Sequence, residues 1–332
     1  MLKAEHIPPV LGSLNLVEAG GFSSALVNGS VYINGLTPPS SEGDATLTSG
    51  INGWILMTKD TKHIHSYYSS NDLYNRIIAG LNEIGKELSK ITLEDLHPVD
   101  EFHICGTVAT KELIQLSDFA SDMHILDVGC GVGGSTRRLA HETGCCVTGV
   151  DLSAEYIDAA QRLTYLLNMQ ERVSFYAASA LDLPFEDNSF DGVWSIQMNM
   201  NVEDKSSWLK ELHRVVKPKG RVVLYEVCAN RNTPVYFPVP WAQDSSISFL
   251  VEPDLFRELL VSAGFDVDVW HDKTDLARNA FANVTKPVGN PELPELGVHL
   301  LVGNDIGTKA YNLHRNLDEE RVSLIEAVAV KP

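Results

Sequence analysis

The nine residues LDVGCGVGG, numbered 126–134, end a short apolar run and open a helical stretch at residues 135–144. Glycines at such a turn let the backbone approach a ligand closely, and the free amides at the start of the helix favour electron-rich groups. The stretch therefore predicts a strand, a ligand-binding turn and a helix. Dinucleotide-binding folds place a similar turn at this position, so the turn alone leaves the ligand class open.

On both sides of this turn, short apolar runs alternate with amphipathic stretches. We expect strands at residues 124–129, 146–152, 173–178, 190–197, 221–227 and 267–272, and a closing apolar strand at the C-terminus. We expect helices at residues 66–91, 107–119, 135–144, 154–168, 208–216 and 253–265, and one more in the C-terminal tail. Residues 96–106 contain a proline and a glycine and predict a loop. The alternation predicts a parallel, doubly wound α/β sheet.

Two further features narrow the ligand class. Asp151 ends the strand that follows the glycine turn, about one βα unit later, where a carboxylate can accept both hydroxyls of a ribose. The third strand is followed by residues 179–185, which read Ser-Ala-Leu-Asp-Leu-Pro-Phe, a turn of the kind that frames an adenine edge. The two features together indicate a ribose site beside an adenine site.

The ordered motifs resemble those of class I S-adenosylmethionine-dependent methyltransferases. They are D-V-G-C-G-x-G-G at 127–134, G-V-D-L-S at 149–153, A-L-D-L-P-F at 180–185, S-F-D-G-V-W at 189–194 and V-V-K-P-K-G at 215–220. The resemblance implies a Rossmann-like core of the class I methyltransferase type and S-adenosylmethionine as the cofactor. It implies cofactor contacts from Tyr67, Asp127, Gly129, Gly131, Gly133, Asp151, Leu152, Ala180, Leu181 and Gln197. Asp127 has an alternative role, which is to cap the glycine turn. The sequence departs from many relatives at Ser179, where they carry Asp.

The resemblance extends to a small-molecule subgroup that includes sarcosine/dimethylglycine N-methyltransferases and tocopherol-type enzymes. In that subgroup a tyrosine-bearing helix and an H-x-G or H-x-x-G element lie over the cofactor, and Tyr67-Tyr68 and residues 100–106, DEFHICG, resemble them. We therefore expect one methyltransferase domain at residues 63–332, with a helical cap at 63–120 and the core with its substrate-side insertions at 121–332. Residues 1–62 would be an N-terminal extension of β type, and residues 25–35, ALVNGSVYING, predict a hairpin within it.

Methyl transfer from a sulfonium is an in-line displacement, so the enzyme mainly aligns the acceptor and excludes water. A hydroxyl acceptor also benefits from losing its proton to a nearby base, and His103 is the candidate because histidine exchanges protons near neutral pH. A structural hydrogen bond or a contact to the cofactor's carboxylate are the alternative roles of His103. Gln197 is the second candidate catalytic residue.

The acceptor should lie where polar side chains follow the fourth strand, because ligands of α/β sheets collect at strand carboxyl ends. Candidate substrate contacts are Asn199, Asn201, Trp241 and Phe249. Loop capping is the alternative role for the asparagines, and a place in the core is the alternative for the two aromatic residues.

The net charge of −18 argues against a nucleic-acid partner, and we interpret Arg137-Arg138 as a solvated helix face and residues 217–219 as a turn. No apolar stretch reaches the roughly 18 residues of a membrane span, and the N-terminus lacks the apolar run of a secretion signal, so we expect a cytoplasmic protein. The five cysteines have no C-x-x-C spacing, which argues against a metal site. A homodimer is possible, with the N-terminal extension as a contact.

The acidic charge and the resemblance favour an amine as the methyl acceptor, in specialised metabolism, over oxygen or carbon acceptors on the same scaffold. Two other classes stay open from the sequence. One is a nicotinamide-dependent oxidoreductase, although the glycine spacing and the later motifs fit methyl transfer better. The other is a protein that binds S-adenosylmethionine as a non-catalytic scaffold.

Overall fold

The computed structural model describes residues 64, 67–68, 72–230, 233–287 and 292–332, and the backbone of five N-terminal strands. The strands β1 (Val17–Ala19), β2 (Phe22–Val27) and β3 (Ser30–Ile33) form one antiparallel sheet, and β4 (Thr46–Gly50) pairs with β5 (Gly53–Met57) in another. The predicted hairpin is confirmed in the antiparallel register of β2 and β3, while Asn28 and Gly29 lie outside the described residues.

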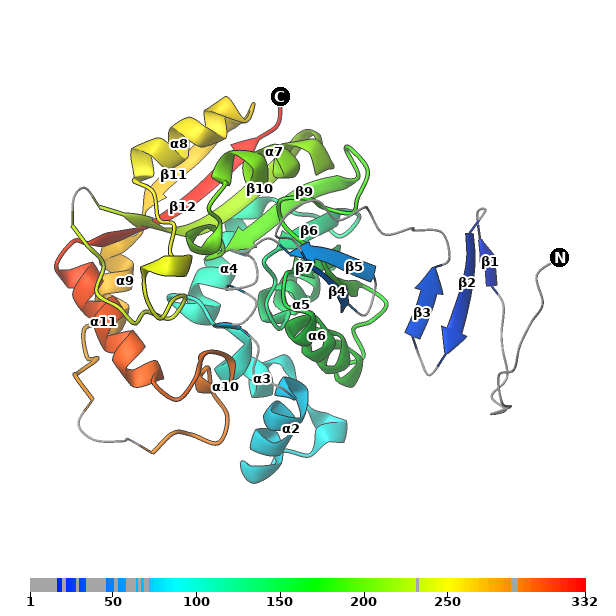
Figure 1. Cartoon of the computed structure of the whole chain (residues 1–332), viewed down its shortest axis with the longest axis horizontal. Helices are drawn as coiled ribbons and strands as arrows, with labels where there is room; N and C mark the ends of the chain where they lie inside the picture. The colour runs from blue at the N-terminus through cyan, green and yellow to red at the C-terminus, as the bar shows by residue number, and fades with distance from the viewer. Residues whose placement is uncertain are drawn as a thin grey trace.

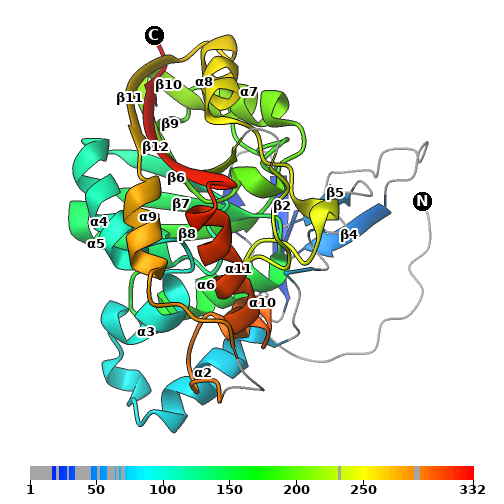
Figure 2. The same ribbon diagram turned by 90° about the vertical axis from the view of Figure 1, so that its left-hand side faces the viewer.

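A seven-stranded sheet forms the centre of the molecule, in the order β11-β12-β10-β9-β6-β7-β8 (Figures 1 and 2). Its strands are β6 (His124–Val128), β7 (Cys146–Asp151), β8 (Val173–Ala177), β9 (Phe190–Ile196), β10 (Val216–Ala229), β11 (Asp266–Asp272) and β12 (Val322–Val330). This order, with helices on both faces, confirms the Rossmann-like, doubly wound fold. The expectation of an all-parallel sheet is wrong, because β12 runs antiparallel to both β10 and β11. A strand buried on both faces has the same continuous apolar pattern in either direction.

Helices cover both faces of this sheet. They are α4 (Gly106–Ser117), α5 (Gly134–Thr143), α6 (Ala154–Leu166), α7 (Lys205–Val215), α8 (Pro253–Ser262), α9 (Thr274–Phe281) and α11 (Ile306–Asp318), while α10 (His299–Val302) packs in a separate core with residues of α6. Alternate residues of β10 enter two separate apolar cores: Tyr225 packs with residues of α4, α5, α9 and α11, and Leu224 with residues of α7 and α8. Successive side chains of a strand point to opposite faces, so the two cores lie on the two sides of the sheet.

The helical region before the core differs from the prediction in two places. Within the described residues, α2 (Leu73–Glu83) forms part of the expected helix at 66–91 and ends early, because the chain turns at Gly85, whose φ of +74° is incompatible with a continuing helix. The expected loop at 96–106 is wrong over its first part, where α3 (Leu93–Asp100) forms with Pro98 inside it. Reciprocal hydrogen bonds between Thr92 and Asp95 cap this short helix at its N-terminus.

The stretch after α7 also departs from expectation. Residues 217–219 belong to the irregular start of β10 instead of a free turn, and the pairing with β9 shifts register between Val216 and Arg221. Lys219 takes a positive φ of +67° there. At the start of α6 the prediction holds, because the Ser153 side chain accepts a hydrogen bond from the amide of Tyr156. Among the helices of the described residues, none has the length and apolar character needed to cross a bilayer.

Candidate functional site

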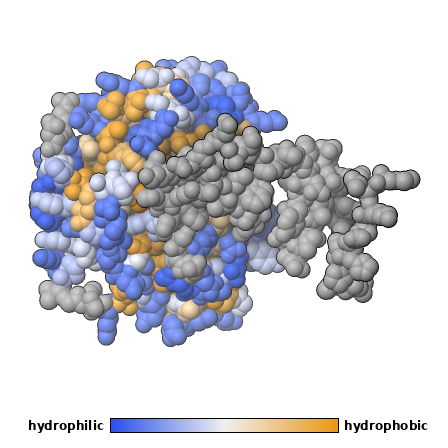
Figure 3. Space-filling view, viewed as in Figure 1, coloured by the Kyte–Doolittle hydropathy of each residue, from blue (hydrophilic) through white to orange (hydrophobic). Residues whose placement is uncertain are grey.

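A cavity of about 410 Å³ lies at the carboxyl ends of β6, β7, β8 and β9. Segments far apart in sequence line it: residues 128–132, 151–153, 178–181, 196–198 and 200–204 from the core, Ile64, Tyr68, Phe102 and His103 from the cap, and Pro240, Trp241 and Phe249 from the later loops. Its size is within the roughly 300–1,000 Å³ of small-molecule sites. On the face seen in Figure 3, patches of hydrophobic residues alternate with hydrophilic ones over the described surface.

The glycine turn forms the floor of the cavity. The amides of Gly129 and Cys130 both donate to the carbonyl of Val150, at 2.8 and 3.0 Å, which fixes the turn against β7. Gly129 has a φ of +80°, and a Cβ there would lie 2.3 Å from Cγ of Met198. A Cβ on Gly131 would meet only the Tyr156 ring, at 4.0 Å, so the backbone at Gly131 is accessible to a ligand.

Asp151 lies beside this turn at the end of β7. Its Oδ2 accepts from the amide of Gly131 at 3.0 Å, and its Oδ1 accepts from the amide of Ser153 at 2.8 Å. Desolvation raises the pKa of Asp151, and these backbone hydrogen bonds oppose the rise. Each oxygen of a carboxylate has further lone pairs, so two hydroxyls of a ribose could still be accepted. Leu152 lines the cavity next to it.

Residues 178–181 form the wall next to Asp151, and Ala180 and Leu181 line the cavity as expected from the motif. The Ser179 hydroxyl accepts a hydrogen bond from the amide of Leu181 at 3.2 Å. Ser179 therefore shapes this turn in addition to bordering the cavity.

Three expected cofactor contacts, Tyr67, Asp127 and Gly133, lie outside the described lining of the cavity. Asp127 is buried beneath the turn, and its Oδ2 accepts hydrogen bonds from Thr136 at 2.6 Å and Ser135 at 3.3 Å. Burial raises the pKa of Asp127 to about 7. Gly133 faces the ring of Phe175, which would lie 2.4 Å from a Cβ at this position. Asp127 therefore binds side chains at the start of α5, and its described hydrogen bonds include none from the amides of the glycine turn. Gly133 allows close packing against Phe175.

His103 lines the cavity just before α4. Its Nε2 lies 3.1 Å from the carbonyl of Gly106 and 3.0 Å from the hydroxyl of Thr110, which itself donates to Glu101 at 2.7 Å. Both neighbours of Nε2 therefore act as acceptors, which assigns the proton to Nε2 and leaves the lone pair on Nδ1. Burial lowers the pKa of His103, and the Glu101 carboxylate opposes the fall. The imidazole is thus neutral near pH 7.

Gln197 also lines the cavity, at the end of β9. Its Oε1 accepts from the amide of Ile104 at 3.2 Å, so the side chain joins the fourth strand to the cap. Its Nε2 is buried and has no hydrogen-bond partner among the described residues. A buried donor of this kind costs free energy unless a ligand or a water satisfies it.

The expected substrate residues fall into two groups. Asn201, Trp241 and Phe249 line the cavity. Asn201 uses its side chain to hold the wall together, because its Nδ2 donates to the carbonyls of Trp241 and Ile247 at 3.0 and 2.8 Å. Asn199 is wholly buried outside the described lining and donates to the carbonyl of Val227 at 2.8 Å. The expected contact between Asn199 and substrate is therefore wrong in this geometry.

The tyrosine pair is also divided. Tyr68 lines the cavity and donates its hydroxyl to Oδ1 of Asn201 at 3.0 Å. Tyr67 points its hydroxyl at the carbonyls of Val239 and Pro240, at 3.3 and 3.1 Å, and lies outside the described lining. The sequence could not distinguish adjacent tyrosines, because their environments depend on loops about 170 residues away.

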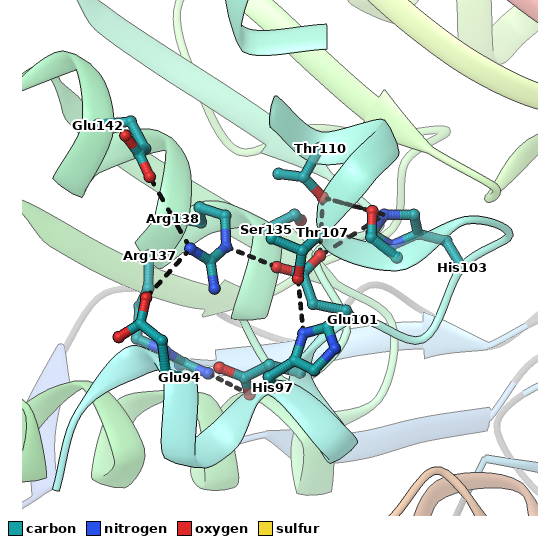
Figure 4. A network of polar contacts seen from close by, with 12 residues as sticks. Glu94, His97, Glu101, His103, Thr107, Thr110, Ser135, Arg137, Arg138 and Glu142 are labelled. Carbon is teal, nitrogen blue, oxygen red and sulfur yellow. Dashed lines mark hydrogen bonds and ion pairs between the residues drawn. The ribbon is translucent and has the colours of Figure 1, made fainter. Parts of the chain in front are cut away.

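Arg137 and Arg138 are buried, contrary to the expected solvated helix face. Arg137 pairs with Asp100 at 2.7 Å, and Arg138 pairs with Glu101 at 2.7 Å (Figure 4). Asp100 also lines the cavity. Sequence analysis missed these acidic residues because each pair joins positions 37 residues apart. The only available signal was the position of both acids within the 100–106 element next to His103.

Two further buried titratable residues, Glu226 and Lys205, support the loop after β9 on the side of the cavity where we expect the methyl acceptor. Glu226 accepts from the amides of Met198 and Asn199 at 3.1 and 3.0 Å, and burial raises its pKa to about 8. Lys205 donates to the carbonyls of Val202, Asn199 and Phe249, and burial lowers its pKa to about 8. These contacts hold the loop after β9, and sequence reasoning gave no sign of them.

The charges that line the cavity are all acidic. They are Asp100, Asp151, Glu203 and Asp204, and no lining residue in the described part of the chain is Lys or Arg. Most of the other lining residues are apolar, among them Phe102, Met200 and Trp241. A phosphate or carboxylate on a second ligand would find no cationic side chain among them.

Comparisons with known proteins agree with this geometry. Residues 126–224 match a family of methyltransferase domains. The chain is 30% identical over 223 residues to the O-methyltransferase resE of Aspergillus sclerotiorum, and the match covers 66% of this chain and 80% of that protein. The chain is a class I S-adenosylmethionine-dependent methyltransferase.

Two further similarities describe the subgroup and the fold. The methyltransferase is 39% identical over 121 residues to the chloroplastic tocopherol O-methyltransferase of Arabidopsis thaliana, over 36% of this chain and 35% of that protein. Its fold is similar to that of geranyl diphosphate C-methyltransferase from Streptomyces coelicolor A3(2), with a TM-score of 0.59 and 18% identity, over 83% of this chain and 98% of that one. The predicted class and its small-molecule subgroup are confirmed, which removes the oxidoreductase alternative.

The residues present fit S-adenosylmethionine. The open backbone at Gly131 and the Asp151 carboxylate beside it lie in one cavity with the turn at 178–181, in the order that a methionine, a ribose and an adenine require. When bound, S-adenosylmethionine supplies an electrophilic methyl group on a sulfonium.

Proposed function

We propose that this methyltransferase transfers the methyl group to a hydroxyl oxygen of a largely apolar small molecule that carries no phosphate or carboxylate. The observation that carries the proposal is the state of His103, a neutral imidazole at the cavity whose Nε2–H is fixed on Gly106 and Thr110. The remaining lone pair on Nδ1 is a base of suitable strength for a hydroxyl near neutral pH.

The proton balance of this reaction is simple. The O–H bond of the acceptor breaks and its proton goes to Nδ1 of His103, while the acceptor oxygen forms a bond to the methyl carbon. The bond between that carbon and sulfur breaks, and its electron pair returns to sulfur, which becomes a neutral thioether. The imidazolium then returns its proton to water. The protein contributes to this step mainly by holding the acceptor oxygen in line with the methyl group and the sulfur.

Gln197 is proposed to orient the acceptor oxygen through its Nε2 donor, which has no partner among the described residues. Trp241 and Phe249 are proposed to cover the apolar body of the acceptor, and Asn201 to fix the wall around them. The absence of Lys and Arg from the described lining disfavours acceptors with a diphosphate or phosphate group.

For the cofactor, we assign the methionine portion to Gly129 and Gly131, the ribose to Asp151 and Leu152, and the adenine to Ala180 and Leu181. We also propose that residues 63–332 form one methyltransferase domain, preceded by an extension at residues 1–62. We further propose that this extension forms the contact of a homodimer.

A second acceptor class is favoured by one observation. Glu203 and Asp204 line the cavity and would attract a protonated amine. N-methylation of an apolar amine, the acceptor that the acidic composition favoured, therefore stays as the alternative. It requires the amine to lose its proton before attack, which His103 could also accept.

The test is a turnover assay with S-adenosylmethionine that carries a deuterated methyl group. Matched phenols, aliphatic alcohols and secondary amines of similar apolar size would be compared, and the products identified by mass spectrometry and by the NMR shift of the new methyl group. We expect methyl ethers as products and loss of turnover in His103→Asn. His141→Asn is the matched control, since His141 is an exposed histidine of α5 that is outside the described lining of the cavity. Products from amines alone, or full activity of His103→Asn, would refute the proposal.

A further inference from the structure

His103 is connected to a buried ion pair. Nε of Arg138 donates to Oε1 of Glu101 at 2.7 Å, and the two side chains are only 4% and 2% exposed. The other oxygen of the same carboxylate, Oε2, accepts from Thr110 at 2.7 Å and lies 3.6 Å from Nε2 of His103 (Figure 4). Three elements contribute: α5 the arginine, the end of α3 the glutamate and α4 the threonine.

The direction of the hydrogen bonds follows from the chemistry of the groups. Arg138 can only donate, so Glu101 accepts on Oε1. An ionised Glu101 can only accept, so the Thr110 hydroxyl donates to Oε2 and its oxygen is left as an acceptor for the Nε2–H of His103 at 3.0 Å. The chain of donors therefore fixes the tautomer of an imidazole that lines the cavity.

We propose that Arg138, Glu101 and Thr110 form a positioning relay for His103, which holds the imidazole as its Nε2–H tautomer and stabilises the imidazolium that forms during turnover. The inference rests on the proposed function, in which His103 takes the proton from the hydroxyl group that becomes methylated. The three residues act through His103, and only His103 is placed next to the reacting atoms.

A second ion pair nearby shows why the relay is more than an anchor for α3. Asp100 and Arg137 already join the end of α3 to α5, and Arg137 is fixed further by the carbonyl of Ala160 and the hydroxyl of Thr164. That pair has no link to His103 among the described contacts. The pair of Arg138 and Glu101 thus reaches His103 through Thr110, and packing of α3 against α5 does not require this contact.

The charges around His103 determine how the relay acts on its protonation. Burial lowers the pKa of His103, Glu101 and the hydrogen bond with the Gly106 carbonyl raise it, and His97 lowers it. The ring of Tyr225 contacts it edge-on, with centroids 6.5 Å apart, and burial raises the pKa of Tyr225, so this phenol stays neutral. Glu101 is therefore the group that favours the imidazolium, while the ion pair with Arg138 holds its carboxylate in place.

The first measurement is ¹⁵N NMR of histidine-labelled protein bound to S-adenosylhomocysteine, with the His103 signals identified by their absence in His103→Asn. We expect the Nε2–H tautomer in the wild type. In Glu101→Gln the pKa of His103 should fall by about one unit, because an opposite charge near the imidazole is removed. In Thr110→Val the share of the Nε2–H tautomer should fall, because the Gly106 carbonyl is then the only acceptor left for this proton among the described contacts, and Thr110→Ser should restore it.

Thr110→Val leaves the ion pair intact, so it tests the relay even if Glu101→Gln does not fold. Glu94→Gln is the matched control, because Glu94 also faces Arg138, at 3.6 Å, but is exposed and has no contact with His103 among the described residues. An unchanged tautomer in Thr110→Val, together with an unchanged pKa of His103 in any Glu101→Gln protein that folds, would overturn the relay.

Kinetics separates this inference from the proposed function. With a hydroxyl acceptor from the turnover assay, Thr110→Val should lower kcat about tenfold and leave KM within about twofold, as expected for loss of a group that orients a catalytic histidine. If His103→Asn keeps full activity, the proposed function fails and the relay fails with it. If His103→Asn is inactive but Thr110→Val and Glu101→Gln match the wild type in kcat and NMR, only the relay fails.

Discussion

The carboxylate of Asp151 and the backbone amide of Gly131 are joined by a hydrogen bond of 3.0 Å, which ties the end of β7 to the glycine turn after β6. The residue that we assign to the ribose thus also holds the turn that we assign to the methionine portion. Loss of this one carboxylate should weaken both parts of the cofactor site.

We expect Asp151→Asn to weaken S-adenosylhomocysteine binding by about 10- to 100-fold, because hydrogen bonds to a charged group contribute about 1.5–3 kcal/mol. Isothermal titration calorimetry measures this directly. Asp158→Asn is the control, since Asp158 is a partly exposed carboxylate on the next helix that pairs only weakly with Arg162, at 3.4 Å. Equal affinity in both variants would show that Asp151 does not bind the ribose.

Gly134→Ala should destabilise the protein by about 1–3 kcal/mol or more, since overpacking costs at least that much. A Cβ at Gly134 would lie 2.1 Å from the carbonyl oxygen of Asp100, a backbone atom that cannot move without displacing α3. Gly85→Ala is the comparison, because it introduces strain at a φ of +74° but meets no atom within 4 Å. Urea unfolding should rank Gly134→Ala as the more destabilised, and the reverse order would contradict the packing argument.

Asp127 should make stability depend on pH. Burial raises its folded-state pKa to about 7 from a usual value of 3.8, so the folded protein holds a proton that the unfolded chain releases between these values. Its contribution therefore falls as the pH rises from about 4 to about 7. Relative to Asp127→Asn, the wild type should lose up to about 4 kcal/mol over this range. Urea unfolding at pH 5 and pH 8 checks this, and parallel behaviour of the two proteins would mean that Asp127 is already ionised at pH 5.

Lys205→Met should loosen the acceptor side of the cavity. The ammonium group of Lys205 donates to three backbone carbonyls, including that of Phe249. Without this donor the buried carbonyls lose a hydrogen-bond partner, which should lower the free energy of unfolding by about 1–3 kcal/mol. KM for the acceptor should rise more than kcat falls, because Phe249 covers the acceptor body in our proposal. Lys210→Met, an exposed lysine of the same helix, serves as control in thermal unfolding and kinetics.

The rate should depend on a deprotonated His103. Burial lowers the pKa of His103 from its usual value of 6.5, so kcat/KM for a hydroxyl acceptor should be level near pH 7 and decline only below that lowered pKa. Below it the rate should fall tenfold for each pH unit, since only the neutral imidazole accepts a proton. A profile without this acid limb would exclude His103 as the base.

Much of the fold could be predicted because its signals are local. The glycine turn at 126–134, the alternation of short apolar runs with helices, and the N-cap at Ser153 depend on neighbours within a few residues. The antiparallel direction of β12 could not be predicted, since a strand buried on both faces has the same apolar pattern whichever way it runs.

The residues of the site likewise fall into those with a local signal in the sequence and those without one. Asp151 and the glycine turn follow from sequence, because carboxyl ends of neighbouring parallel strands meet at one edge of a sheet. The choice of Tyr68 over Tyr67 depends on a loop about 170 residues away, and Asn199 is turned into the core although Asn201 lines the cavity. Such side-chain directions are decided by packing between distant segments.

By itself, the sequence determined the class of enzyme, its cofactor and the order of its central elements, because motifs and periodicity are properties of the local chain. Only the tertiary structure decided that Arg138 is buried against Glu101 and that this pair reaches His103 through Thr110. A charged residue in an amphipathic helix is read as solvated unless its partner is known. Burial of that charge is tolerated only when folding brings an opposite charge from 37 residues away to within hydrogen-bond distance, because an unpaired buried charge is strongly destabilising.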